Sequence, residues 1–136
     1  MESQGMNQRG VEGGEAALPP GPVADAPYVV LRHTGQRRGA AGGDHYDLLV
    51  DLAAGGAQRR VWTWRIFNPI EHWGPETPAE RIADHRIMYM TYEGEISGGR
   101  GAVRRVAAGT AVLEWREQGL ILVRLGGLGA SLRLPM

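Results

Sequence analysis

Short runs of apolar and β-branched residues recur along the chain from Tyr28 onward, and glycine pairs separate many of them. The clearest run, residues 45–52, alternates between two faces with the two-residue period of a β-strand. We expect about eight strands on this pattern. Their ranges are 28–33, 45–52, 61–67, 87–92, 102–106, 110–115, 120–125 and 131–134.

Strands of this length and spacing predict an all-β fold, a small closed or nearly closed β-barrel. Only residues 77–81 are typical of a helical turn, because Thr77 can cap it, Pro78 suits its first position and Glu80 completes a capping box. Trp62 and Trp64 are two apart and share one strand face, where we expect them in the barrel core.

Residues 1–27 contain few large apolar side chains and are rich in Gly, Glu and Pro. Burial of so little apolar surface cannot offset the conformational entropy that the segment would lose on ordering. We therefore expect residues 1–27 to be a disordered tail and residues 28–136 to form one domain. The tail carries acidic residues and no apolar core, which is not typical of a secretory signal. No apolar run is long enough for a membrane span.

Charge and cysteine content narrow the classes of function. Among the 136 residues, fifteen basic side chains balance fifteen acidic ones, so any phosphate site requires a local cluster rather than a basic coat. There is no cysteine, which excludes disulfides and thiolate metal sites. We expect a cytoplasmic monomer.

The histidines are the strongest candidates for chemistry. His45 and Asp47 are two apart on a predicted strand and therefore share a face. If 28–33 and 45–52 pair as a hairpin, His33 falls near His45 and completes a set of two histidines and one carboxylate for a divalent metal. The alternative is that each histidine is an isolated residue at the surface or a strand end. His72, in a segment rich in turn signals, is expected to be structural or exposed.

Two further groups could contact phosphate. His85, after Asp84, could donate to a phosphate oxygen or protonate a leaving group, or it could simply bond a nearby backbone carbonyl. Arg37 and Arg38 lie between His33 and His45 and could clamp a phosphate, or form an ordinary solvated pair.

Beyond these patterns, the chain from Tyr28 onward resembles the 3′-phosphoesterase domain of bacterial DNA ligase D, a multidomain enzyme of end joining. The resemblance is carried by an ordered set of blocks. These blocks are 29–33, 45–52, 64–69, 84–89, 92–99 and 119–125.

The resemblance implies a compact β-barrel that holds a divalent metal, most fittingly Mn²⁺. It implies an activity that trims ribonucleosides and removes phosphate at the 3′ end of a primer strand, leaving a 3′-OH for a ligase or polymerase. The family's metal ligands would fall on His33, His45 and Asp47. A phosphate-contacting catalytic histidine would fall on His85, with a supporting tyrosine at Tyr89.

Several of the family's phosphate-contact positions differ in this chain. An arginine two residues after the metal-binding aspartate is replaced by Leu49, and Leu31, Asn68 and Ala83 stand where the family has polar or charged residues. The gap between the first two ligands is longer than usual, and the family's N-terminal segment has no evident counterpart. Candidates for a replacement arginine are Arg32, Arg37, Arg38, Arg65 and Arg81.

Three functions fit these observations. The first is a metal-dependent phosphoesterase that heals nucleic-acid 3′ ends during DNA repair, acting on a DNA or RNA/DNA end with a separate ligase or polymerase. The second is a catalytically impaired metal-binding barrel that recognises DNA ends or a repair partner. The third is a phosphoesterase with a smaller or non-nucleic substrate, which the neutral net charge would suit.

Overall fold

The computed structural model describes residues 22–35, 43–52, 60–116 and 119–136. No helix in these ranges is long and apolar enough to cross a membrane. The elements in chain order are β1 (Val23–Thr34), β2 (His45–Val50), β3 (Arg60–Ile66), η4 (Ile70–His72), β4 (Glu80–Arg86), η5 (Ile87–Met90), β5 (Gly94–Glu95), β6 (Ala102–Arg116), β7 (Leu120–Leu125) and β8 (Ala130–Pro135).

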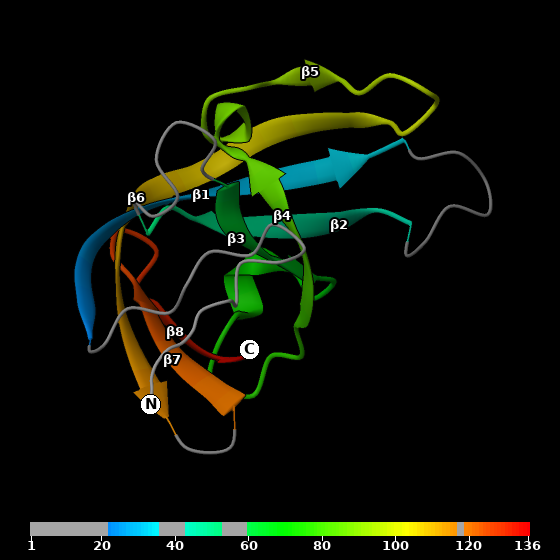
Figure 1. Cartoon of the computed structure of the whole chain (residues 1–136). Coiled ribbons are helices and arrows are strands. Elements are labelled where there is room, and N and C mark those ends of the chain that lie inside the picture. Colours follow the sequence, from blue (N-terminus) through cyan, green and yellow to red (C-terminus); the bar gives the residue numbers. More distant parts are fainter. Residues whose placement is uncertain (1–21, 36–42, 53–59, 117–118) are drawn as a thin grey trace.

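The eight strands form a single antiparallel sheet that curls into a half-barrel (Figure 1). Their order is β4-β3-β2-β1-β6-β7-β8, and the short β5 pairs with β6. The indole of Trp64 in β3 donates to the carbonyl of Pro135 in β8 at 2.7 Å, and Arg133 in β8 contacts Glu76, which precedes β4. The all-β prediction is confirmed, and side chains connect the two ends of the curled sheet.

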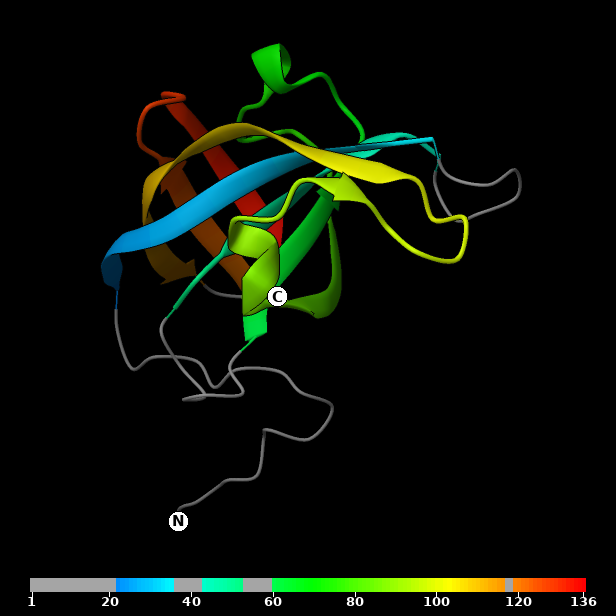
Figure 2. The same ribbon diagram turned by 90° about the horizontal axis from the view of Figure 1, so that it is seen from above.

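β6 is one long strand where the sequence predicted two. Its first part pairs with β1 and its last part with β7, so it curves across the molecule beside β1 (Figure 2). Gly109 lies between the two predicted strands and pairs with Tyr28 of β1. A Cβ there would approach the carbonyl of Gly126 to 2.8 Å and the ring of Tyr28 to 3.2 Å. The glycine therefore permits close packing within the strand and does not end it.

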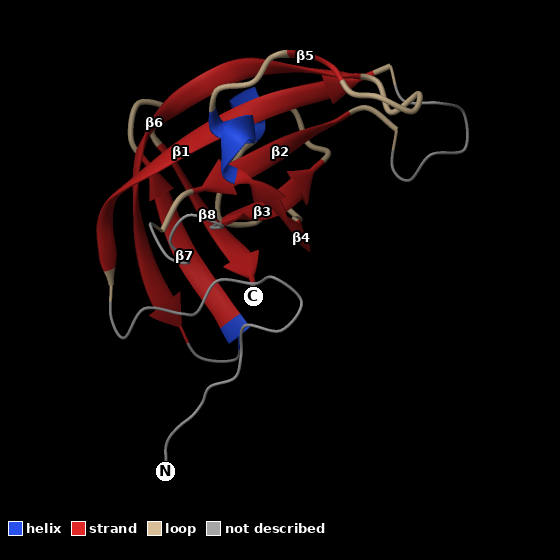
Figure 3. Ribbon diagram, turned by 45° about the horizontal axis from the view of Figure 1, so that its top comes forward, coloured by secondary structure: helices blue, strands red, loops and turns tan. Residues whose placement is uncertain are grey.

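Apolar side chains pack on both faces of the sheet. The main core lies inside the curl and includes Trp62 and Trp64, as the sequence predicted. A smaller cluster on the other face contains Val29, Leu31, Leu49, Val61 and Val103. Its cover comes from Ile87, Tyr89, Met90, Tyr92 and Ile96, on and after the η5 turn. Figure 3 shows this turn against the sheet.

The structure corrects the prediction for residues 77–92. No helical turn forms at Thr77, whose hydroxyl instead accepts from the amide of Gly74 at 2.8 Å and closes a turn. The next residues enter β4, and the predicted strand 87–92 begins with the 3₁₀ turn η5. Residues three apart eclipse one another in such a turn, which brings Ile87 and Met90 onto the same apolar cluster.

The start of the folded part is also corrected. β1 begins at Val23, ahead of the predicted boundary at Tyr28, and Ala26 is buried in the main core. The amide of Asp51 donates to the carbonyl of Pro27 at 2.9 Å. Residues 23–27 are therefore part of the sheet, while the rest of the predicted tail, residues 1–21, lies outside the described residues.

Candidate metal centre

Three potential metal ligands come from the first two strands of the sheet. β1 and β2 pair antiparallel, with His33 opposite His45 and Leu31 opposite Asp47. Residues two apart on a strand share a face, so His45 and Asp47 point to the same side of the sheet as His33. The pairing that the sequence analysis took as a condition for a three-ligand set is present in the structure.

The three side chains converge. The ligating atoms of His33, His45 and Asp47 lie within 4.8 Å of one another. Nε2 of His45 is 3.1 Å from Oδ1 of Asp47, and Nδ1 of His33 is 3.8 Å from Oδ2. All three residues are at least nine-tenths buried. Two imidazoles and one carboxylate in this arrangement could hold a metal ion.

Backbone carbonyls determine which nitrogen of each imidazole faces Asp47. Nδ1 of His45 lies 2.7 Å from the carbonyl oxygen of Gly43, and Nε2 of His33 lies 2.6 Å from that of Arg100. A carbonyl oxygen only accepts, so these two nitrogens donate. In each neutral ring the other nitrogen then directs a lone pair toward the carboxylate. Metal-binding histidines are commonly held by such a hydrogen bond on their far side.

This arrangement calls for a cation. Nε2 of His45 and Oδ1 of Asp47 are buried, and neither has a hydrogen-bond partner among the described residues unless a proton joins them. When His45 is neutral, both atoms are acceptors, and two buried acceptors 3.1 Å apart are unfavourable. Either a proton on the imidazole or a metal ion bound by both groups removes the conflict.

The close contact between the Asp47 carboxylate and the His33 imidazole also shifts the pKa values of both groups. Burial alone would raise the pKa of Asp47, but hydrogen bonds from His33, His45 and His85 outweigh burial and hold that pKa far below its ordinary value. The Asp47 carboxylate in turn raises the pKa of His33, and burial opposes it. Without metal, the carboxylate therefore favours a protonated His33 beside it.

His85 approaches the same carboxylate from β4. Its Nε2 lies 3.5 Å from Oδ2 of Asp47, and its Nδ1 lies 3.4 Å from the carbonyl oxygen of Ala83. The ring packs edge-on against Tyr89 of η5, with 5.5 Å between ring centroids, and Tyr89 packs likewise against Tyr92 at 5.6 Å. The two residues expected from the resemblance to act beside the metal thus lie beside its candidate ligands.

A cavity of about 340 Å³ opens onto this group. His33, Asp47, His85 and Tyr89 line it, together with apolar residues of the smaller cluster. Asp84 and three arginines, Arg65, Arg86 and Arg100, also line it. The cavity therefore combines candidate metal ligands, a partly exposed imidazole and several cationic side chains, which suits an anionic ligand.

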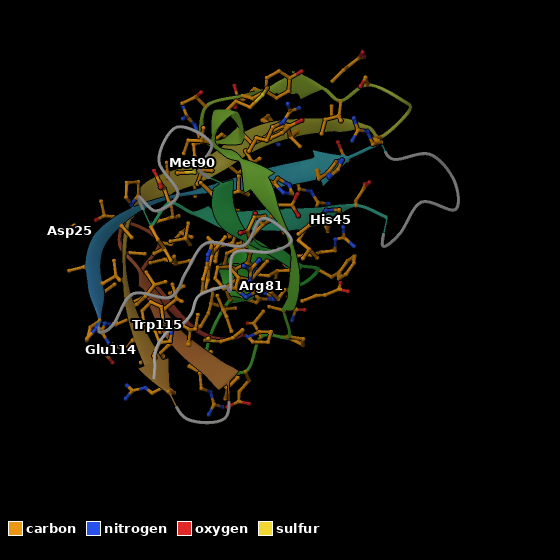
Figure 4. The ribbon with its side chains drawn as sticks, in the orientation of Figure 1. Asp25, His45, Arg81, Met90, Glu114 and Trp115 are labelled. Carbon is orange, nitrogen blue, oxygen red and sulfur yellow. The ribbon has the colours of Figure 1, made fainter. Side chains whose placement is uncertain are left out.

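Among the three predicted arginines that the structure describes, only Arg65 lines the cavity. Arg65 lies opposite Asp47 on β3, and its Nε is buried without a hydrogen-bond partner among the described residues. Arg32 lies over the ring of Tyr46, on the other face of the sheet. Arg81, labelled in Figure 4, stacks on tryptophans of the main core.

The remaining predicted arginines, Arg37 and Arg38, lie outside the described residues. Sequence reasoning missed Arg86 and Arg100. Arg86 directly follows His85 at the end of β4, where the alternation of a strand would have assigned it to the opposite face. Arg100 contacts His33 through its backbone carbonyl, a contact that does not depend on residue type and leaves no signal in the sequence.

His72 provides a useful contrast. It lies exposed in η4 and does not line the cavity, as the sequence led us to expect.

Comparison with known proteins adds no identification. No protein-family model matches the chain, and no curated protein matches it.

Proposed function

We propose that this protein is a metal-dependent phosphoesterase, a hydrolase that processes the 3′ ends of nucleic acids, with Mn²⁺ as its most fitting metal. The observation that carries the proposal is the group of His33, His45 and Asp47, which opens through His33 and Asp47 onto a cavity that His85 and three arginines also line. The resemblance to the ligase D phosphoesterase domain supports the choice of a 3′ end as substrate.

His33, His45 and Asp47 would hold the metal. Their mixed nitrogen and oxygen donors fit Mn²⁺ and other divalent ions of intermediate hardness. When bound, such an ion supplies Lewis-acid stabilisation of a phosphoryl oxygen. The backbone carbonyls of Gly43 and Arg100 keep the two imidazoles oriented for this task.

The arginines of the cavity would bind the phosphate. Arg65 is the leading candidate, because it lies across from Asp47 on the neighbouring strand and its side chain is four-fifths buried. A guanidinium can donate two parallel hydrogen bonds to phosphate oxygens. On this proposal Arg65 takes over from the family's arginine at the position of Leu49.

His85 would act on the reacting phosphate. It is more exposed than the three candidate ligands, and its Nε2 is directed toward Asp47 at the metal group. An imidazole there can donate to a phosphoryl oxygen or protonate the leaving oxygen. Tyr89 packs edge-on against this ring and would help to hold it in place.

The test uses the purified full chain, Mn²⁺ and a labelled primer-template that ends in a 3′-phosphate or a single ribonucleotide. We expect release of phosphate or of the terminal nucleoside, and loss of both Mn²⁺ binding and turnover in His45→Ala. His72→Ala is the matched control, because this histidine is exposed and outside the cavity. No turnover in the wild type, or turnover that survives His45→Ala, would contradict the proposal.

One observation favours a second function, a metal-binding barrel that recognises DNA ends or a repair partner without turnover. Leu49, at the position of the family's arginine, is fully buried in the smaller apolar cluster and offers no donor to the cavity. Loss of one positioned donor can lower a rate by about 10²–10³-fold. Binding of a 3′-phosphate end with no product under any divalent metal would favour this function over the first.

A further inference from the structure

β4 contains an extra residue just before His85. Thr63 of β3 pairs with Ile82, but Val61, two residues away, pairs with His85, three residues away. The two strands therefore do not advance in step. This is a β-bulge, in which one strand carries an unpaired residue.

The bulge determines which side chain of β4 reaches the metal group. In a regular ladder, Val61 would pair with Asp84, and alternation would turn His85 to the opposite face, where Arg81 lies. With the extra residue, His85 faces the cavity and approaches Asp47. A shift of one residue would thus exchange the imidazole for a carboxylate at the metal group.

The side chain of Thr63 compensates for the interrupted ladder. Its hydroxyl donates to the carbonyl of Val61 at 3.0 Å and accepts from the amide of His85 at 3.2 Å. Thr63 is fully buried, so water cannot easily replace these bonds. The hydroxyl thus attaches the backbone of His85 directly to β3.

Arg81 stabilises the other side of the same bulge. Its guanidinium forms an ion pair with Asp84 at 2.7 Å and donates to the carbonyls of Thr63 at 3.3 Å and Ile82 at 2.6 Å. It also lies 4.7 Å from the centre of the Trp62 ring. The ion pair ties the Asp84 carboxylate to Arg81, while Asp84 also lines the cavity beside His85.

We propose that Thr63 is a positioning residue whose hydroxyl holds the β4 bulge in the register that directs His85 at the metal group. The role of His85 in turnover depends on the proposed function, but its placement by Thr63 does not. Thr63 does not line the cavity, and its hydroxyl is connected to the site through the backbone amide of His85.

The direct test measures the place of His85 without any activity. In the metal-free full chain, nuclear Overhauser effects should connect the rings of His85 and Tyr89, whose centroids are 5.5 Å apart. We expect Thr63→Val, which keeps the shape and removes the hydroxyl, to abolish these signals. Thr63→Ser, which restores the hydroxyl, should recover them. Unchanged signals in a folded Thr63→Val variant would overturn the proposal.

Deletion of Ala83 provides a second route if Thr63→Val does not fold. The shortened β4 pairs in step with β3, and His85 remains opposite Val61 without a bulge. Because this chain has no bulge for the Thr63 hydroxyl to hold, Thr63→Val combined with the deletion should keep the nuclear Overhauser effects between the rings of His85 and Tyr89. Their loss on Thr63→Val in the shortened chain would overturn the proposal.

Turnover separates this proposal from the proposed function. With Mn²⁺ and a 3′-phosphate end, Thr63→Val should lower kcat by about 10²-fold through misplacement of the imidazole, at unchanged Mn²⁺ affinity. Combined with His85→Ala, it should cause no further loss, since it acts through that residue. A further loss would overturn the proposal. An inactive wild type with the expected ring signals would reject the proposed function and leave the placement by Thr63 supported.

Discussion

Nε2 of His45 and Oδ1 of Asp47 face each other at 3.1 Å from the same side of β2. The far nitrogen of His45 donates to the carbonyl of Gly43, so the near one has no proton of its own when the ring is neutral. Two buried acceptors this close together fit a site that could hold a cation. The same carboxylate also shifts the pKa of His33, and His33 and Asp47 together give the metal-free protein a pH dependence that can be measured.

The metal-free protein should lose stability as the pH rises above neutrality. The pKa of His33 is raised, so its contribution to the free energy of unfolding is present below the unfolded value of 6.5 and is lost as the pH rises through the folded value. The pKa of Asp47 is lowered, so its contribution is present above the unfolded value of 3.8 and is lost as the pH falls further.

From these two groups, stability should be greatest between about pH 4 and 6.5 and the Tm should decline toward pH 8. Tm measured against pH by circular dichroism, with excess chelator, checks this. His33→Gln should flatten the decline above pH 6.5. An equal decline in the wild type and in that variant would show that His33 does not cause it.

Much of the metal group could be predicted from the sequence, for a local reason. The two-residue period puts His45 and Asp47 on one face, and pairing of consecutive strands brings His33 opposite His45. Both inferences need only short-range regularities. The all-β fold follows in the same way from short alternating runs between glycines.

The features of the fold and site that the sequence did not predict depend on contacts between residues far apart in the chain. A threonine at position 77 can cap a helix, but it can equally close a turn through its hydroxyl, as it does here with the amide of Gly74. That the next residues form β4 becomes evident only from their pairing with β3. The extra residue before His85 is invisible without the partner strand. Arg65 could be separated from Arg32 and Arg81 only once the strand register was known.

Removal of Arg65 should affect phosphate chemistry much more than removal of Arg32. Arg65 lines the cavity, while Arg32 stacks on Tyr46 on the other face of the sheet. We expect Arg65→Ala to lower turnover of a 3′-phosphate end by about 10²-fold or more, since it removes a donor to the phosphate. Arg32→Ala is the matched control and should stay within about threefold. Equal losses in the two variants would remove Arg65 from the phosphate site.

Leu49→Arg should not restore the family's phosphate contact. Leu49 is fully buried against Leu31, Val61 and other members of the smaller apolar cluster, so an arginine there buries an unpaired charge. We expect a loss of about 3–5 kcal/mol in the free energy of unfolding, measured by urea titration. Leu49→Met, of similar volume, should cost less than about 1.5 kcal/mol. A stable Leu49→Arg variant with increased turnover would show instead that the position still opens onto the site.

Truncation at the N-terminus should show whether the folded domain begins at Val23, where β1 begins, or at Tyr28, as the sequence predicted. Deletion of residues 1–27 removes the beginning of β1, including the buried Ala26 and the carbonyl that accepts from Asp51. We expect this deletion to lower the Tm by several degrees, as the loss of about 1 kcal/mol would in a domain of this size. Deletion of residues 1–21 removes none of the described contacts and should leave the Tm unchanged. Equal Tm values for the two truncated chains would return the boundary to Tyr28.

Anomalous X-ray diffraction can show whether His33, His45 and Asp47 bind one divalent ion at the cavity, as we claim. Crystals of the full chain grown with Mn²⁺ are measured on both sides of the manganese absorption edge. We predict one strong anomalous peak at roughly 2.0–2.3 Å from Nδ1 of His33, Nε2 of His45 and a carboxylate oxygen of Asp47. An empty site at saturating Mn²⁺, or a peak bound by other residues, would contradict the claim.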